Sequence, residues 1–447
     1  MNNKQVMFAA VDAHRAEILA AERYIWQHPE TGFREWETHA YLKEKFEALG
    51  CTLTEPGDIP GFWVDFDTGR PGPRVAVFGE MDALIIPEHP EAHPVRHTVH
   101  ACGHNAQCAA LYGIAAALSA PGALDGLSGS IRLIAVPAEE LIEVEYRSGL
   151  IREGKLHAFG GKPEFLLRGY LDDCDMAFMV HLDSRFTLTP GSNGVIAKRY
   201  IFLGKASHAA IPHNGRNALY AATNAMNAVN ALRETFRAAD KVRFHPIITH
   251  GGDSVNVIPD RVVIETYVRG RTLAAMEAVN RQVNRAFAAA AAGMGCSLRI
   301  EDRFGYAPRS DDKNLTAVMA DAAREFLPED QLSLHGSFEA GSTDMGDISC
   351  VMPVLHPYIG GAKGGGHSVN YRVADPEMAC VTNAKIQLGA LARLLENDAA
   401  LASKVLAEKK VPFASVAEYR EMLERFTFEG DAVVYNDDGT VTLRTGN

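Results

Sequence analysis

Short apolar runs alternate with longer segments of helical spacing over residues 1–190 of the chain. The runs are rich in Val, Ile, Leu and Phe, a composition that favours buried strands. They cover residues 62–66, 74–79, 130–137 and 176–180. Segments 35–49 and 105–120 have helical periodicity. This alternation predicts an α/β fold in which a mostly parallel sheet is sandwiched by helices.

A different pattern occupies residues 191–307. Its order is strand, helix, two strands, helix and strand, and both helices have apolar residues at intervals of three to four. We expect a smaller, inserted α+β domain with an antiparallel sheet and one layer of helices. Because the alternation of helices and strands resumes after Arg309, the first domain is discontinuous and comprises residues 1–190 and 308–447. The tail predicts two helical segments and a hairpin that turns at Asp437-Asp438-Gly439.

Size and composition indicate an ordinary globular protein. A chain of 447 residues exceeds the size of one hydrophobic core, which agrees with two domains. The net charge of −12 argues against nucleic acid or an anionic membrane as the main partner. The amino terminus has the pattern of an amphipathic helix and not of a signal peptide, and no apolar segment reaches membrane-spanning length. Seven scattered cysteines favour reduced thiols, so we expect a cytoplasmic protein.

Polar side chains follow three of the predicted strands. Glu80 and Asp82 follow the second strand, the pair Glu139-Glu140 follows the third, and His181 follows the fourth. In a parallel sheet these strand ends lie at one edge, where ligands bind. We therefore expect the candidate site there.

The segment His100-Ala101-Cys102-Gly103-His104 is the strongest chemical signal in the chain. A thiolate and neutral imidazoles are good ligands for a borderline-soft divalent ion. A metal hydrolase also needs a base near the attacking water. One carboxylate of the pair Glu139-Glu140 can bind metal while the other accepts the proton of water and later passes it to the leaving amine.

These residues occur within a set of motifs that resembles one known family, the clan MH metal-dependent amidohydrolases and metallopeptidases. Its members include aminoacylases, carboxypeptidase G, auxin-conjugate hydrolases and aminobenzoyl-glutamate hydrolases. The matching motifs occur in the family's order over roughly residues 20–395. They are HPETGFREWET, GEMDAL, HACGHNA, VPAEE, MVHLD, GKASHAAIPHNGRNAL, SVNVIPDR, GSTDMGD and GGGHSVNYRVADPE.

The resemblance implies a role for each matching residue. The five implied metal ligands are Cys102, His104, Glu140, His181 and His367. They correspond to a binuclear site in which a thiolate replaces the bridging aspartate of other branches. Glu139 would be the general base and acid. Three outer residues would support the ligands, namely Asp82, His100 and Asp344.

The resemblance also assigns the inserted domain, residues 191–307, as a lid that supplies dimer contacts. His208 would polarise the scissile carbonyl, often that of the neighbouring subunit. Asn256 would contact the substrate amide, and Arg269 would hold the substrate carboxylate. The implied assembly is a homodimer.

This chain departs from the family pattern at three places. Asn105 follows HACGH where many relatives have Asp, and Glu80 stands where Asp is usual. Residues 141–180 form a longer and more basic connection than is common, in which Arg147, Arg152 or Arg168 could meet an anion. These differences concern the substrate more than the core chemistry.

The resulting prediction is a metal-dependent hydrolase that cleaves the amide bond of N-acyl, including aroyl, amino acids by metal-activated water. The cofactor would be two divalent ions, zinc or manganese. One alternative keeps the scaffold but acts as a dipeptidase or as a hydrolytic deaminase of an aromatic amine. A second alternative, a catalytically silent small-molecule binder, disagrees with the intact base and ligand positions.

Overall fold

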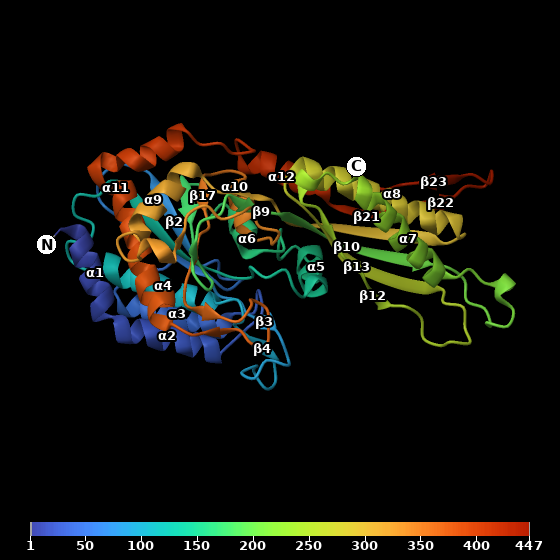
Figure 1. Cartoon of the computed structure of the whole chain (residues 1–447), viewed down its shortest axis with the longest axis horizontal. Helices are drawn as coiled ribbons and strands as arrows, with labels where there is room; N and C mark the ends of the chain where they lie inside the picture. The colour runs from blue at the N-terminus through green and yellow to red at the C-terminus, as the bar shows by residue number, and fades with distance from the viewer. Residues whose placement is uncertain (1, 447) are drawn as a thin grey trace. The chain divides into compact units, whose positions relative to one another are not determined.

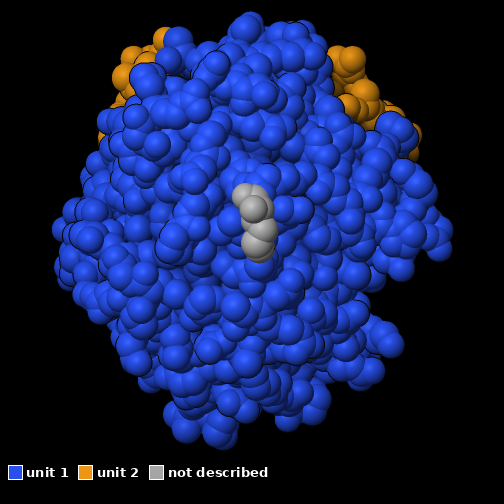
Figure 2. Space-filling model, turned by 90° about the vertical axis from the view of Figure 1, so that its left-hand side faces the viewer, with its two compact units in different colours: residues 1–191, 310–338, 347–414 blue, residues 192–309, 339–346, 415–447 orange. Residues whose placement is uncertain are grey.

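The structure is a computed structural model that describes residues 2–446, and the chain divides into two compact units (Figures 1 and 2). Unit 1 consists of Met1–Gly191, Ser310–Phe338 and Asp347–Ala414. Unit 2 consists of Ser192–Arg309, Glu339–Gly346 and Ser415–Asn447. Among the helices described, none has the length and apolar character needed to cross a membrane.

The central sheet of unit 1 has the order β1-β5-β2-β6-β17. These strands are β1 (Phe62–Asp67), β5 (Ser130–Val136), β2 (Arg74–Glu80), β6 (Met176–Phe178) and β17 (Val354–Leu355). All neighbours pair in parallel except β1, which runs antiparallel to β5. The predicted mostly parallel sheet is therefore confirmed, and the carboxyl ends of β2, β5 and β6 lie at one edge.

Helix α4 (His104–Leu118) is buried at every position. It packs on β2 and β5 and is surrounded by four other helices (Figure 1). These are α1 (Asn3–Ala13), α2 (Arg15–Gln27), α3 (Trp36–Ala48) and α11 (Asn383–Ala407). Small residues make this packing possible, since a Cβ at Gly113 would lie 2.9 Å from Ile18. The central position of α4 fixes His104, its first residue, and the loop before it, which carries Cys102.

The apolar run over residues 351–358 contributes to two short strands in the structure, β17 and β18 (Tyr358–Ile359). Pro357 lies between them and has no backbone N–H to continue a ladder. Strand β18 pairs with β7 (His181–Leu182) and β8 (Phe186–Thr187), and β8 also pairs with β16 (Leu332–Ser333).

Unit 1 also contains further elements outside the central sheet. They are β3 (Leu84–Ile85), β4 (Thr98–Val99), α5 (Val144–Arg152), α6 (Gly161–Leu167), α9 (Lys313–Ala323), β19 (Ala362–Lys363) and β20 (Arg372–Val373). Helix α11 contains non-helical residues from Glu396 to Ala399, so its regular first part ends at Leu395.

Unit 2 has an antiparallel sheet of order β11-β13-β10-β14-β21, with β12 also paired to β13. Its strands are β10 (Gly194–Leu203), β11 (Arg243–Phe244), β12 (Ile247–His250), β13 (Arg261–Gly270), β14 (Ser297–Tyr306) and β21 (Phe428–Asp431). Helices α7 (Ala218–Leu232) and α8 (Leu273–Gly293) pack side by side on β10 and β13. The element order matches the predicted insertion.

The carboxyl-terminal tail differs from the predicted division, which left it with the first domain. Strand β21 pairs with β14 in the register Arg299↔Asp431, and Asn284 donates a hydrogen bond from Nδ2 to the Thr445 carbonyl (2.9 Å). The tail also contains α12 (Val416–Phe426) and the predicted hairpin, formed by β22 (Val433–Tyr435) and β23 (Val441–Leu443). The described part of the tail, residues 415–446, therefore belongs to unit 2, and β21 extends its sheet.

Candidate metal centre

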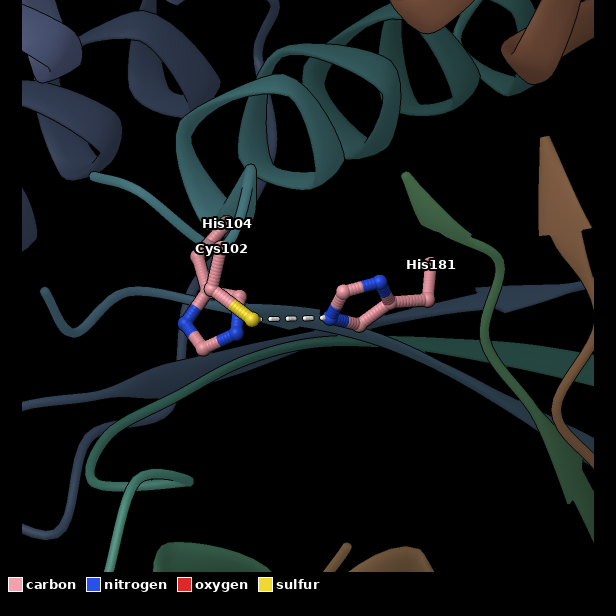
Figure 3. A group of neighbouring side chains, drawn as sticks. All are labelled: Cys102, His104 and His181. Atoms are coloured by element: carbon pink, nitrogen blue, oxygen red, sulfur yellow. Dashed lines mark hydrogen bonds between the residues drawn. The ribbon is translucent and has the colours of Figure 1, made fainter. Parts of the chain in front are cut away.

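The five predicted ligands lie together in unit 1 and form two groups that share Cys102. Cys102, His104 and His181 form one group, and Cys102, Glu140 and His367 form the other. Within each group the donor atoms lie within 4.8 Å of one another. Figure 3 shows the Cys102 sulfur pointing at the His181 ring, with Sγ 3.3 Å from Nε2. Two groups with one shared sulfur could hold two neighbouring ions.

The tight turn between Cys102 and His104 depends on glycine. Gly103 is the residue before α4 and has a φ of 83°, in the left-handed region. Its N–H donates to the His100 carbonyl (3.0 Å). A Cβ at this position would lie 2.4 Å from the Tyr371 hydroxyl oxygen, so only glycine fits here.

Hydrogen bonds orient the two imidazoles. His104 donates from Nδ1 to the carbonyl oxygen of Asp82 (2.9 Å) and to its carboxylate (3.1 Å). His181 donates from Nδ1 to the Leu182 carbonyl (2.9 Å). Because these acceptors require a proton on Nδ1, Nε2 is the nitrogen through which each ring can bind a metal ion. The other oxygen of Asp82 accepts the Glu140 N–H (2.8 Å), so Asp82 positions ligands in both groups.

Two of the donor atoms lie close to other polar atoms without forming hydrogen bonds to them, as is expected if they bind a divalent cation. His104 Nε2 and Glu140 Oε1 are buried without a suitably oriented hydrogen-bond partner among residues 2–446. Yet His104 Nε2 lies 3.1 Å from Glu80 Oε2, and Glu140 Oε1 lies 3.0 Å from His367 Nε2. Buried polar atoms that converge without hydrogen bonds are costly unless another group binds them. Sulfur, nitrogen and carboxylate donors of this kind suit zinc and also accommodate manganese.

The electrostatics favour the ligand form of Cys102. Burial opposes ionisation of the thiol, but His181 and His104 outweigh that effect and hold the pKa of Cys102 well below its usual range. Burial and the neighbouring Cys102 raise the pKa of Glu140 to about 7. Since thiolate and not thiol binds metal, the site is arranged to supply its sulfur donor.

The predicted base and outer residues occupy different surroundings. Glu139 forms a third group with Glu80 and His104, whose ligand atoms also lie within 4.8 Å of one another. His100 is buried, and burial lowers its pKa to about 3, so the ring is neutral. Asp344 is buried within the Glu339–Gly346 segment of unit 2.

In unit 2 the structure brings His208 and Asn256 together but not Arg269. The segments that carry His208 and Asn256 meet at a bridge between His208 and Val257, and Ala209 donates its N–H to the Asn256 carbonyl (2.9 Å). Both side chains are exposed. Arg269 lies at the far end of β13, half-buried beside Tyr267.

His367 lies on a glycine-rich loop and has a φ of 60°. Its N–H donates to the Ala101 carbonyl (2.9 Å), which joins this loop to the Cys102 segment. The preceding glycines do not all serve a close approach. A Cβ at Gly364 would lie 2.2 Å from the Asn370 carbonyl oxygen, whereas Gly366 has open space around it.

Sequence reasoning missed the partners of Glu80. Lys162 is fully buried and its Nζ lies 2.5 Å from Glu80 Oε1, while Gln107 donates from Nε2 to Glu80 Oε2 (3.0 Å). The carboxylate beside His104 is thus neutralised by a cation from the long 141–180 connection. Arg168 of that connection is engaged by Glu164 and Asp58. The only sequence signal for Lys162 is a lysine in a short segment that has one other charged residue, Glu164.

The departure at Asn105 has a structural reason. Asn105 is fully buried and donates from Nδ2 to Glu22 Oε1 (2.7 Å). Burial raises the pKa of Glu22 to about 7. An aspartate at position 105 would replace the amide donor by a second acceptor at the same distance, so the Asn belongs to a matched pair with Glu22.

We expect Asn105→Asp to destabilise the protein by roughly 2–4 kcal/mol, because it replaces the amide donor to Glu22 by a second buried carboxyl group. Urea unfolding monitored by circular dichroism would measure the loss. Adding Glu22→Gln supplies an amide donor from the other side and should restore a large part of the stability. A double variant as unstable as Asn105→Asp alone would contradict the pairing.

Comparison with known proteins gives a family model and relatives that agree with the metal-hydrolase prediction. The model described as peptidase family M20/M25/M40 matches residues 76–393. Xaa-Arg dipeptidase from Mus musculus is 30% identical over 372 residues, covering 78% of this chain and 77% of the relative. One of the subunits of p-aminobenzoyl-glutamate hydrolase from Escherichia coli is 30% identical over 349 residues, covering 75% of this chain and 66% of the relative.

A solved structure also shares the fold. It is a dinuclear metal-binding peptidase of the M20 family from Bacillus subtilis, with a TM-score of 0.65 and 23% identity. The match covers 86% of this chain and 99% of that one.

Proposed function

This chain belongs to peptidase family M20/M25/M40 and is a metal-dependent hydrolase of C–N bonds, and we propose that it cleaves the amide bond of N-acyl amino acids with two bound divalent ions. The observation that carries this proposal is the sharing of Cys102 by the two donor groups. The ions, zinc or manganese, would be held by Cys102, His104 and His181 on one side and by Cys102, Glu140 and His367 on the other. When bound, such ions polarise the scissile carbonyl and activate water.

The chain's own residues supply the proton transfers. Glu139, grouped with His104 and Glu80, accepts a proton from the attacking water and returns it to the leaving amine. Asp82 keeps His104 and the Glu140 backbone in place during this transfer.

The substrate contacts are assigned to unit 2. His208 assists the developing oxyanion and Asn256 contacts the amide, which their exposed positions on adjoining loops support. Arg269 would hold the substrate carboxylate. The dimer proposed from the family resemblance would allow His208 to serve the neighbouring subunit.

We assign an aroyl-amino acid as the preferred substrate, supported by the similarity to one chain of an aminobenzoyl-glutamate hydrolase. The similarity to Xaa-Arg dipeptidase favours dipeptide cleavage as the second candidate. Zinc- and manganese-loaded protein would be incubated with N-benzoyl and aminobenzoyl-glutamate, N-acetyl amino acids, Xaa-Arg dipeptides and an aminoarene. We expect release of free amino acid from the aroyl substrates and no ammonia from the aminoarene. Ammonia without amide cleavage would contradict the amidohydrolase assignment, and preference for the dipeptides would favour the second candidate.

A further inference from the structure

The residue before the Glu139-Glu140 pair has an unfavourable backbone conformation. Ala138 has a φ of 57°, in the left-handed region, which costs a residue with a Cβ about 1–2 kcal/mol. Such a conformation persists only where the surrounding structure enforces it. The turn therefore has to be held from outside.

Three hydrogen bonds hold the backbone around Glu139. Glu35 Oε1 accepts the Ala138 N–H (2.8 Å), and the Ala138 carbonyl accepts the Gly161 N–H (3.1 Å). On the other side of Glu139, Asp82 accepts the Glu140 N–H (2.8 Å). Carboxyl groups thus hold the peptide group that enters Ala138 and the one that follows the proposed base, and the Gly161 N–H holds the peptide group between Ala138 and Glu139.

Glu35 is placed there at a cost to stability. Its side chain is completely buried, and Oε2 has no hydrogen-bond partner among the residues that the structure describes. Burial, together with the nearby charge of Asp82, raises the pKa of Glu35 well above its usual range. A buried carboxyl group with one open oxygen destabilises a fold, so packing alone does not account for it.

Arg147, from the long 141–180 connection, lies near the same turn, since a Cβ at Gly32 would lie 2.3 Å from Arg147 Nη2 and 2.7 Å from Ala138 Cβ. It is completely buried and donates from Nη1 to the Phe159 carbonyl (2.7 Å), while Nε and Nη2 have no partner among residues 2–446. Buried polar atoms without hydrogen-bond partners are expected at functional sites, where the position of a group matters more than the stability of the fold.

We propose that Glu35 is a positioning residue for Glu139: it fixes the left-handed turn at Ala138 and thereby aims the Glu139 carboxylate at the attacking water. The inference rests on the proposed function, in which Glu139 is the base. It gives a role to the HPETGFREWET motif, which contributes none of the ligands.

The test compares Glu35→Ala, Glu35→Asp and Glu35→Gln in the metal-loaded full chain. Alanine removes the oxygen that accepts the Ala138 N–H. Aspartate keeps the carboxyl group, but its side chain is one methylene shorter and places the oxygen farther from that N–H. For both we expect kcat to fall about 10- to 100-fold, as small misplacements of a catalytic group do, with KM and metal content unchanged. Gln keeps an oxygen that can accept the Ala138 N–H and should retain most of kcat. Glu37→Ala, an exposed position on the same helix, is the matched control.

Hydrogen exchange gives a readout that is independent of activity. Losing one backbone hydrogen bond should speed exchange of the amides of residues 138–140 by about five- to tenfold in Glu35→Ala and Glu35→Asp, and not in Glu35→Gln. Unchanged exchange and kcat, a Gln variant as impaired as Ala, or a loss of metal that parallels the loss of kcat would each overturn the proposal. If the wild type cleaves no amide, the proposed function fails, while exchange still decides whether Glu35 holds the turn.

Discussion

Glu139→Gln should lower kcat for amide hydrolysis by about 10²- to 10⁴-fold, the usual contribution of a general base, while the chain keeps its full metal content. Glutamine has nearly the same shape as glutamate, but its amide cannot accept a proton from water. The proposed ligands are the members of the two groups that share Cys102, whereas Glu139 belongs to the third group, with Glu80 and His104. Steady-state kinetics on an aroyl-amino acid, together with metal analysis of the same preparation, would measure both quantities.

Glu145→Gln is the matched control, because Glu145 is an exposed glutamate on α5 that pairs with Arg152 outside the donor groups. This variant should have wild-type kinetics. If Glu139→Gln instead loses metal, Glu139 is a ligand and the roles within the pair Glu139-Glu140 need to be exchanged. A Glu139→Gln variant that retains kcat would remove Glu139 from the mechanism.

The sequence was most informative where chemistry and local pattern coincide. The apolar runs that became β2 and β5 are each followed directly by their acidic residues, so the parallel arrangement of the strands places Asp82 and Glu140 near each other. The HACGH loop precedes a helix of small apolar residues, which predicts that it is buried and fixed. Each of these features is local in sequence, and the order of the strands in the sheet brings them to one edge.

The contacts that hold the site in place were not predictable in this way. Lys162 reaches Glu80 across 82 positions, and Glu35 reaches the Ala138 N–H across 103. Hydrophobic periodicity shows which face of an element is buried but not which distant polar group it meets there. The same limit applies to β21, whose pairing with the edge of β14 moved the tail into unit 2.

Cys102→Ala should have the largest effect on metal binding, because it removes the donor common to both groups. We expect the variant to lose metal from both positions, with a fall in affinity greater than the roughly 10- to 100-fold that follows loss of an outer partner. His181→Ala and His367→Ala each remove a donor from one group only, so each should retain one ion more firmly than Cys102→Ala does. Metal analysis after dialysis against a graded chelator would rank the variants, with Cys51→Ala as the control for loss of a thiol elsewhere.

Cys102→Asp keeps a donor at position 102 but changes the donor atom from sulfur to oxygen. A carboxylate can bridge two ions as it does in the other branches of the family that the sequence resembles. Because replacing sulfur by oxygen favours the harder ion, this variant should keep two ions and shift its preference from zinc towards manganese. Such a shift would establish Cys102 as the shared ligand, since a merely structural cysteine would not alter metal selectivity. If Cys102→Ala still binds two ions per chain with wild-type affinity, the sulfur is not a ligand and the binuclear assignment fails with it.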